Sequence, residues 1–200
     1  MKTIYLLLIA LLATTCDSDD PVDPASLLPP ITTTGENTFG CLIDGKFFRP
    51  RDGRSTINSD NKGLRLLSSE AENIEIHAYD RKSDFTGNLI IHLENFDSQG
   101  LGTYVIDVSN SLRGIDGNNN NYMNCRFWSE KTNSYQNYIS FDNSGIVEIS
   151  NLEFEQGIKN IYSGIFYSKL INVQNLNDTI EIKSGRFDIE TYTLSNTRFN

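Results

Sequence analysis

The sequence predicts a single all-β domain, either an antiparallel sandwich or a barrel-like fold, of about nine or ten strands. Beyond about Thr38, apolar and polar residues alternate with the period of two that is typical of strands. Clusters of Asp, Asn, Ser and Gly separate the alternating stretches, and no stretch shows a helical period. A hydrophobic content of 38% in 200 residues is enough for one core.

The predicted strands follow one another at short intervals. Phe39, Cys41 and Ile43 share one face of the first strand, and Asp44-Gly45 then forms a dipeptide typical of a tight hairpin turn. Because alternate side chains of a strand point to opposite faces, each run has one apolar face for the core. The remaining alternating runs are 73–79, 89–94, 104–108, 123–127, 147–149, 161–165 and 180–182.

The N-terminus has the layout of a secretory signal. A single positive charge at Lys2 precedes an apolar stretch from Ile4 to Ala13, which is shorter than the about 20 residues that a membrane-spanning helix needs. The stretch ends in Ala13-Thr14-Thr15-Cys16, which resembles a bacterial lipobox. That resemblance implies cleavage before Cys16 and lipid attachment to its thiol.

The box departs from the usual pattern, which has Leu three residues before the cysteine and Gly, Ala or Ser directly before it. Ala13 and Thr15 stand at those two places. The alternative is an ordinary secretory cleavage near Ala13, with Cys16 left as a thiol or in a disulfide. We expect a lipoprotein signal peptide at residues 1–15, a lipidated tether at 16–37 and the all-β domain at 38–200.

The start of the predicted tether resembles a localisation signal. Asp17-Ser18-Asp19-Asp20 resembles the acidic export signal that sends Bacteroidota lipoproteins to the outer face of the outer membrane, although the same run also serves as a solvated spacer. Four of the five prolines lie between Pro21 and Pro30, which favours an extended, flexible linker. The sequence therefore predicts an outer-membrane lipoprotein, at the cell surface rather than on the periplasmic face.

Both ends of the domain resemble a flavobacterial (Bacteroidota) family of exported lipoproteins of unknown function. The residues that carry the resemblance are Leu28-Pro29-Pro30, the segment 34–41 (Thr-Gly-Glu-Asn-Thr-Phe-Gly-Cys), Ile43-Asp44-Gly45-Lys46, and the late segments 161–166 and 182–188. The middle of the chain is too different to compare. The resemblance implies an exported β-domain and brings no known activity with it.

The charge of the chain limits its partners. A formal net charge of −9 argues against nucleic-acid binding, which needs a basic face. No phosphate loop, nucleophile elbow or zinc-protease motif occurs, and the sequence indicates no cofactor. The expected partners are a membrane, through the lipid anchor, and a glycan or an envelope protein.

Cys41 and Cys125 remain as a pair if Cys16 is lipidated. Because the export route is oxidising, a disulfide between them is the slightly favoured prediction. The alternative is a pair of buried free thiols, since both residues lie on the apolar faces of their strands and unpaired cysteine packs well in a core.

The two histidines each have a carboxylate nearby, in Glu75-x-His77 and His92-x-Glu94. If the runs 73–79 and 89–94 form a hairpin, two registers keep both apolar faces on the core, with either His77 or Glu75 opposite His92. Either register gathers two imidazoles and two carboxylates, which are ligands that zinc or another transition metal accepts. The alternative is a solvated sheet face with a cross-strand ion pair.

Tyr122, Arg126 and Trp128 fall on one face of the run 122–128, in an arrangement typical of carbohydrate-binding sheets. We therefore expect a non-catalytic β-domain with a binding or structural role and an unidentified ligand. The alternative is a small glycan-acting hydrolase whose carboxylates escape recognition, with Glu148, Glu153 and Glu155 as the nearest cluster.

Overall fold

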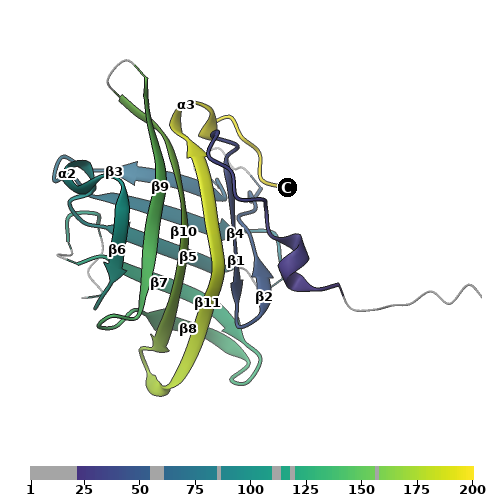
Figure 1. The fold of residues 1–200 in the computed structure, drawn as a ribbon. Coiled ribbons are helices and arrows are strands. Elements are labelled where there is room, and N and C mark those ends of the chain that lie inside the picture. The colour runs from purple at the N-terminus through teal and green to yellow at the C-terminus, as the bar shows by residue number, and fades with distance from the viewer. Residues whose placement is uncertain (1–21, 55–60, 85–86, 110–113, 118–119, 156–157) are drawn as a thin grey trace, which may run out of the picture.

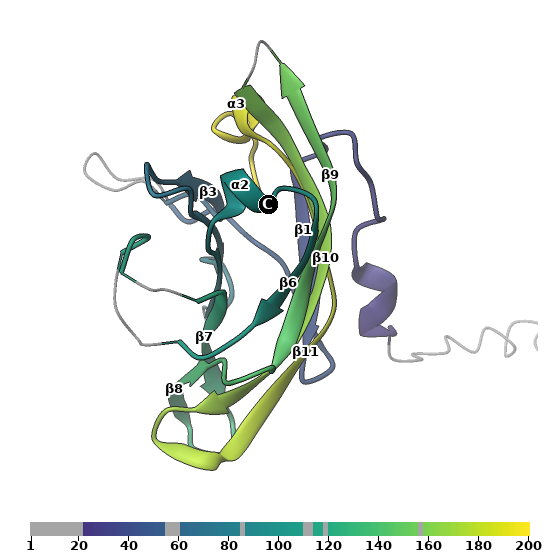
Figure 2. The same ribbon diagram turned by 60° about the vertical axis from the view of Figure 1, so that its left-hand side comes forward.

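The computed structural model describes residues 22–54, 61–84, 87–109, 114–117, 120–155 and 158–200. Antiparallel strands dominate the described chain, as the sequence predicted, and the sheet does not close on itself. Two layers of strands face each other across one core and form a sandwich (Figure 1, Figure 2). The signal peptide, Cys16 and the acidic run fall within residues 1–21 and lie outside the described residues.

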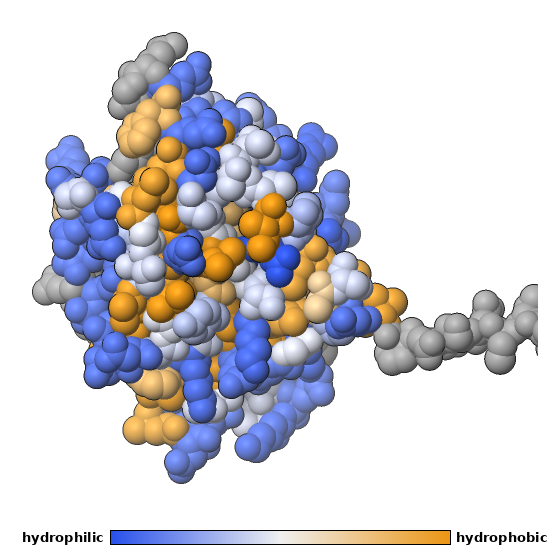
Figure 3. Space-filling view, in the orientation of Figure 1, coloured by the Kyte–Doolittle hydropathy of each residue, from blue (hydrophilic) through white to orange (hydrophobic). Residues whose placement is uncertain are grey.

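The first layer, called the front layer because its long strands cross the view of Figure 1 in front, has the order β2-β1-β11-β10-β9-β6. Its strands are β1 (Thr38–Ile43), β2 (Lys46–Phe48), β6 (Gly102–Ile106), β9 (Gly145–Glu155), β10 (Ile158–Asn172) and β11 (Asn175–Glu190). Polar and apolar side chains are mixed on its outer face (Figure 3). The exposed apolar ones include Val105 and Ile165.

The second layer, called the back layer, has the order β8-β7-β5-β4-β3. Its strands are β3 (Leu64–Ser68), β4 (Ile74–Asp80), β5 (Gly87–Leu93), β7 (Tyr122–Ser129) and β8 (Ser134–Ile139). The far end of β10 pairs with β8, with Ile171 opposite Ile139, and so joins the two layers at one side. Three short helices complete the described elements: η1 (Pro24–Leu27), α2 (Phe96–Gln99) and α3 (Thr191–Leu194).

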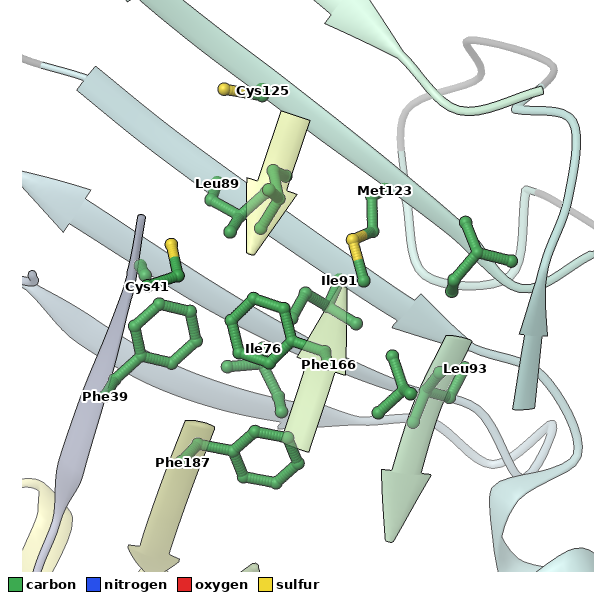
Figure 4. Close-up of a cluster of buried hydrophobic side chains, with 14 of the residues drawn as sticks. Phe39, Cys41, Ile76, Leu89, Ile91, Leu93, Met123, Cys125, Phe166 and Phe187 are labelled. Atoms are coloured by element: carbon green, nitrogen blue, oxygen red, sulfur yellow. The ribbon is translucent and has the colours of Figure 1, made fainter. Parts of the chain in front are cut away.

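The core lies between the layers and contains the apolar faces that the alternation predicted. Ile76, Leu89 and Ile91 of the back layer are fully buried (Figure 4). They face aromatic rings of the front layer, where Phe166 packs 5.3 Å from Phe39 between ring centroids. Burial of each such side chain contributes about 1.5–3 kcal/mol, so this interior is the main source of stability.

Strands with little alternation were not recognised from the sequence. β8 reads Ser-Tyr-Gln-Asn-Tyr-Ile, and Tyr138 alone of its side chains joins the core cluster. β2 and β3 are also short, and so carry too few apolar positions to show a period. The turn at Asp44-Gly45 was predicted correctly, with φ angles of 47° and 75°.

The segment expected to be a free tether is partly attached to the domain. Residues 24–37 run along the outside of the front layer (Figure 2), and Pro29 packs so closely on β1 that a Cβ at Gly40 would come within 2.7 Å of its ring. Asp188 of β11 accepts hydrogen bonds from the backbone N–H groups of Gly35 and Glu36. A domain boundary at residue 38 therefore cuts off a segment that the sheet holds in place.

Cys41 and Cys125 are two free, buried thiols instead of the disulfide that the sequence slightly favoured. Both point into the core between the layers (Figure 4), where a small apolar side chain is stable without a covalent partner. Burial raises the pKa of each thiol well above its usual range, so both are protonated and unreactive. Among the described residues, no helix is long and apolar enough to cross a bilayer.

Candidate functional site

The outer face of the back layer carries the candidate residues in three rows that cross the strands. Strand register sets each row, because directly paired residues of neighbouring strands point to the same side. The first row is Leu67, Glu75, His92 and Tyr122; the second is Arg65, His77, Ile90, Asn124 and Ile139; the third is Tyr79, Asn88, Arg126 and Asn137. The pairing of Glu75 with His92 is one of the two registers that the sequence allowed.

Glu75 is the centre of a hydrogen-bonded network. Its carboxylate accepts hydrogen bonds from Nε2 of His77 at 2.6 Å, Nδ1 of His92 at 3.2 Å and the hydroxyl of Tyr122 at 2.9 Å. The Tyr79 hydroxyl lies 3.1 Å from the remaining ring nitrogen of His77. Hydrogen bonds to a charged group contribute about 1.5–3 kcal/mol each, so the network fixes these side chains firmly.

The electrostatics of the network keep Glu75 ionised. Burial by itself would raise the pKa of this carboxyl, but hydrogen bonds from His77, His92 and Tyr122 outweigh that effect and lower it to about 2. Burial and the neighbouring carboxylate raise the pKa of Tyr122. At neutral pH the cluster is therefore a carboxylate with its hydrogen-bond donors around it.

The same network argues against the hypothesis that His77, His92, Glu75 and Glu94 bind a metal ion. Glu94 lies beyond the end of β5, and both ring nitrogens of His77 already have hydrogen-bond partners. The described residues hold no group of three or more His, Cys, Asp and Glu that could bind a metal ion. The structure gives the metal site no support, because Glu75 and Tyr79 engage both nitrogens of His77 and leave His92 Nε2 as the one imidazole nitrogen of the described residues without a partner.

The face is also less solvated than the alternative prediction assumed. The cross-strand pair of Glu75 and His92 exists, but the two residues are only 5% and 0% exposed. The His92 ring stacks on Tyr122 with centroids 4.7 Å apart. Described residues 114–117 stand outside this layer (Figure 2), and Asn73 Nδ2 donates to the carbonyl of Ile115 and so fixes that segment.

Two cavities open on this face. The first, here called the histidine cavity, has a volume of about 460 Å³, and its lining includes Glu75, His77, Tyr122 and Asn124. The second, here called the arginine cavity, has a volume of about 480 Å³, and its lining includes Arg54, Arg81 and Asn61. Asn88 and Arg126 line both, so the two cavities adjoin. Each lies within the size range of small-molecule sites.

Two of the three arginines of the arginine cavity stack on tyrosine rings. The Arg81 guanidinium carbon lies 4.2 Å from the ring centre of Tyr79, and that of Arg126 lies 4.3 Å from the ring centre of Tyr135. Stacking uses the flat face of a guanidinium and leaves its N–H edges able to donate hydrogen bonds. These two groups are therefore held in position beside the cavity.

Asp80 is the one carboxylate that the described residues contribute to the lining of the arginine cavity, and it is already neutralised. Asp80 accepts two hydrogen bonds from Arg51, at 2.8 and 2.6 Å, and another from the Ser83 hydroxyl. Burial raises the pKa of Asp80, yet these hydrogen bonds lower it further than burial raises it. Within the described chain, neither Arg54 nor Arg126 forms an ion pair with a carboxylate.

The predicted ligand face is partly brought together. Tyr122 and Arg126 border the cavities, as the strand pattern indicated. Trp128 points to the same side but lies past the cavities, with its ring edge-on to Tyr135 at 5.2 Å. Three lining residues were not predicted from the sequence: Arg54, Arg81 and Asn88. The two arginines carry no local signal, because they lie in connections after strands and not in an alternating run.

The carboxylates proposed for a hydrolase do not meet at this site. Glu148, Glu153 and Glu155 lie exposed along β9 of the front layer, opposite three different residues of β10. No family model, curated protein or solved structure matches the chain.

Proposed function

We propose that this chain is a cell-envelope lipoprotein of the Bacteroidota kind, held in the outer membrane through lipid on Cys16. In this proposal the outer face of the back layer binds a ligand without converting it, and that ligand is either a glycan or an envelope protein. The observation that carries the binding role is the pair of adjoining cavities on the outer face of the back layer. A polar lining that combines aromatic rings, amides and fixed charges is typical of ligand recognition.

A non-catalytic role fits the acid–base state of the lining better than hydrolysis does. Glycoside hydrolysis needs one carboxylic acid that gives up a proton near neutral pH. Glu75 and Asp80 both have lowered pKa values and full sets of hydrogen bonds, so each is an anion at that pH. Neither is suited to act as a general acid.

The anchor is tested by labelling cells that express the full-length protein with radioactive palmitate. We expect label in the wild-type chain and none in Cys16→Ala, with the wild type in the outer-membrane fraction and open to added protease on intact cells. Equal labelling of both chains, or none in either, would refute the anchor and leave the binding role to be judged by itself.

The binding role is tested with the purified full-length protein on a glycan array and by capture of envelope proteins. Asn124→Trp should fill the histidine cavity and abolish binding, because Asn124 lines it. Glu148→Gln, an exposed change on the other layer, is the matched control and should bind like the wild type. Release of shortened glycan during the incubation would favour the hydrolase instead.

A further inference from the structure

We propose that the arginine cavity binds the acidic group, a carboxylate or a sulfate ester, of a glycan whose uncharged part lies in the histidine cavity. This inference rests on the proposed binding role and adds the chemical class of the ligand. The chain has a net charge of −9, yet three of its arginines line one cavity. A fourth, Arg51, neutralises Asp80, the one carboxylate that the described residues contribute to that lining.

The arginines have the arrangement that an oxyanion needs. Arg81 and Arg126 both line this cavity and are fixed by their tyrosine rings, and their N–H edges match the paired oxygens of a carboxylate or sulfate. Arg81 Nε also donates to the Lys62 carbonyl at 3.3 Å, which anchors the side chain further. The side chains therefore need little reordering when an anion binds, which lowers the entropic cost of binding.

The adjoining histidine cavity suits an uncharged, hydroxyl-rich body. Asn88, Asn124 and Asn137 line it with amides that both donate and accept hydrogen bonds. Ile90 and the Tyr122 ring supply apolar surface for the C–H face of a sugar. Because Glu75 is an anion in its lining, a second acidic group would be repelled there, so the ligand is expected to carry its charge at one end.

This charge pattern distinguishes the ligand from nucleic acid. A nucleic acid carries a negative charge on every unit, and its binding needs a continuous basic face. Here the arginines of the arginine cavity lie next to an anionic carboxylate, Glu75, in the adjoining cavity. Recognition of one acidic group on a neutral body is the chemistry that this layout supports.

The experiment measures affinity of the full-length protein in detergent by calorimetry. The acidic probes are sialyl-lactose, which has one carboxylate, and lactose with one sulfate ester, and the uncharged probe is lactose. We expect at least one acidic probe to bind at least tenfold more tightly than its uncharged counterpart. Comparison of the carboxylated with the sulfated probes identifies the source of the charge.

The variants tie the preference to the cavity. Arg81→Gln should lower affinity for the acidic probe at least tenfold and leave affinity for the uncharged probe unchanged. Arg126→Gln, at a residue that lines both cavities, should lower affinity for the acidic probe at least tenfold and affinity for the uncharged probe by less. Arg126→Lys, which keeps the charge but not the paired N–H edges, should give an intermediate loss. Arg49→Gln, an exposed arginine that borders a different cavity, is the control and should change nothing.

The possible failures are distinguishable. Equal binding of acidic and uncharged probes, unaffected by the arginine variants, would overturn this inference and leave the proposed binding role standing. Absence of binding by every acidic probe would also overturn it, whereas the role itself fails only if the array and the capture experiment find no ligand. Thermal unfolding of each variant shows whether a loss of binding reflects a loss of folding.

Discussion

Each layer has one buried carboxylate on its outer face, and the two differ in their hydrogen-bond donors and in the space beside them. Asp188 of the front layer and Glu75 of the back layer are 1% and 5% exposed, and each accepts several hydrogen bonds. Asp188 receives the backbone N–H groups of residues 34–36 and the Ser163 hydroxyl. Glu75 receives only side-chain donors and borders a cavity.

The comparison separates a structural carboxylate from one at a ligand site. The chain fills the space above Asp188 with its own N-terminal segment, so nothing else can approach that group. Beside the Glu75 network, in contrast, the histidine cavity remains unfilled. Burial and ionisation alone therefore do not distinguish a carboxylate at a ligand site from a structural one. The cavity beside the carboxylate makes that distinction.

The largest expected effect is at Asp188. Asp188→Asn removes the anion from three backbone donors and the Ser163 hydroxyl, and we expect the free energy of unfolding to fall by about 3 kcal/mol. Urea unfolding at pH 7 measures it, with the exposed Glu148→Gln as control. The N-terminal segment should also become open to proteolysis; a variant with unchanged stability would show that the segment, not the carboxylate, holds this region.

A slightly smaller loss is expected at Glu75, and it should depend on pH. The folded pKa of about 2 lies below the ordinary value of 4.5, so ionisation stabilises the fold above pH 4.5 and this contribution is lost as pH falls towards 2. The shift corresponds to about 3 kcal/mol at most. Glu75→Gln should be about 2 kcal/mol less stable at pH 7, and the gap should close by pH 2. A gap that stays constant across this range would refute the lowered pKa.

Removal of one hydroxyl from each network sharpens the comparison. Ser163→Ala leaves Asp188 with no substitute donor under the packed segment, and we expect a loss of about 1–2 kcal/mol. Tyr122→Phe keeps the ring against His92, and water from the cavity can replace the lost hydroxyl, so its loss should stay below about 1 kcal/mol. Equal losses in thermal unfolding would mean that the two sites are filled alike.

The smallest effect is expected for a carboxylate that is paired but not buried. Glu130 forms an ion pair with Lys46 at 2.8 Å, yet both side chains are more than 70% exposed. Such pairs contribute little, because solvent screens the charges and both chains lose freedom. Glu130→Gln should therefore leave the melting temperature unchanged, and a clear decrease would show that burial is not what separates these carboxylates.

The sequence predicted what depends on neighbours along the chain. Alternation in β4 and β5 identified which residues face the core and limited the Glu75–His92 contact to one of two registers. Contacts between distant segments gave no such signal. The segment held by Asp188 precedes it by more than 150 residues, and proline content alone predicted a free linker. The arginine cavity combines the connections after β2 and β4 with β7, an arrangement that only the packed fold reveals.

The attachment of the N-terminal segment also has a mechanical consequence. A pull on the chain ahead of Pro24 would not unzip β1 from its end. It would load side chains on two interior strands, since Asn151 of β9 binds the carbonyl of Thr33 and Arg186 of β11 binds that of Pro29. Asp188 then shares the load through three parallel hydrogen bonds. Tension from an upstream anchor would thus be spread across the front layer before any strand separates.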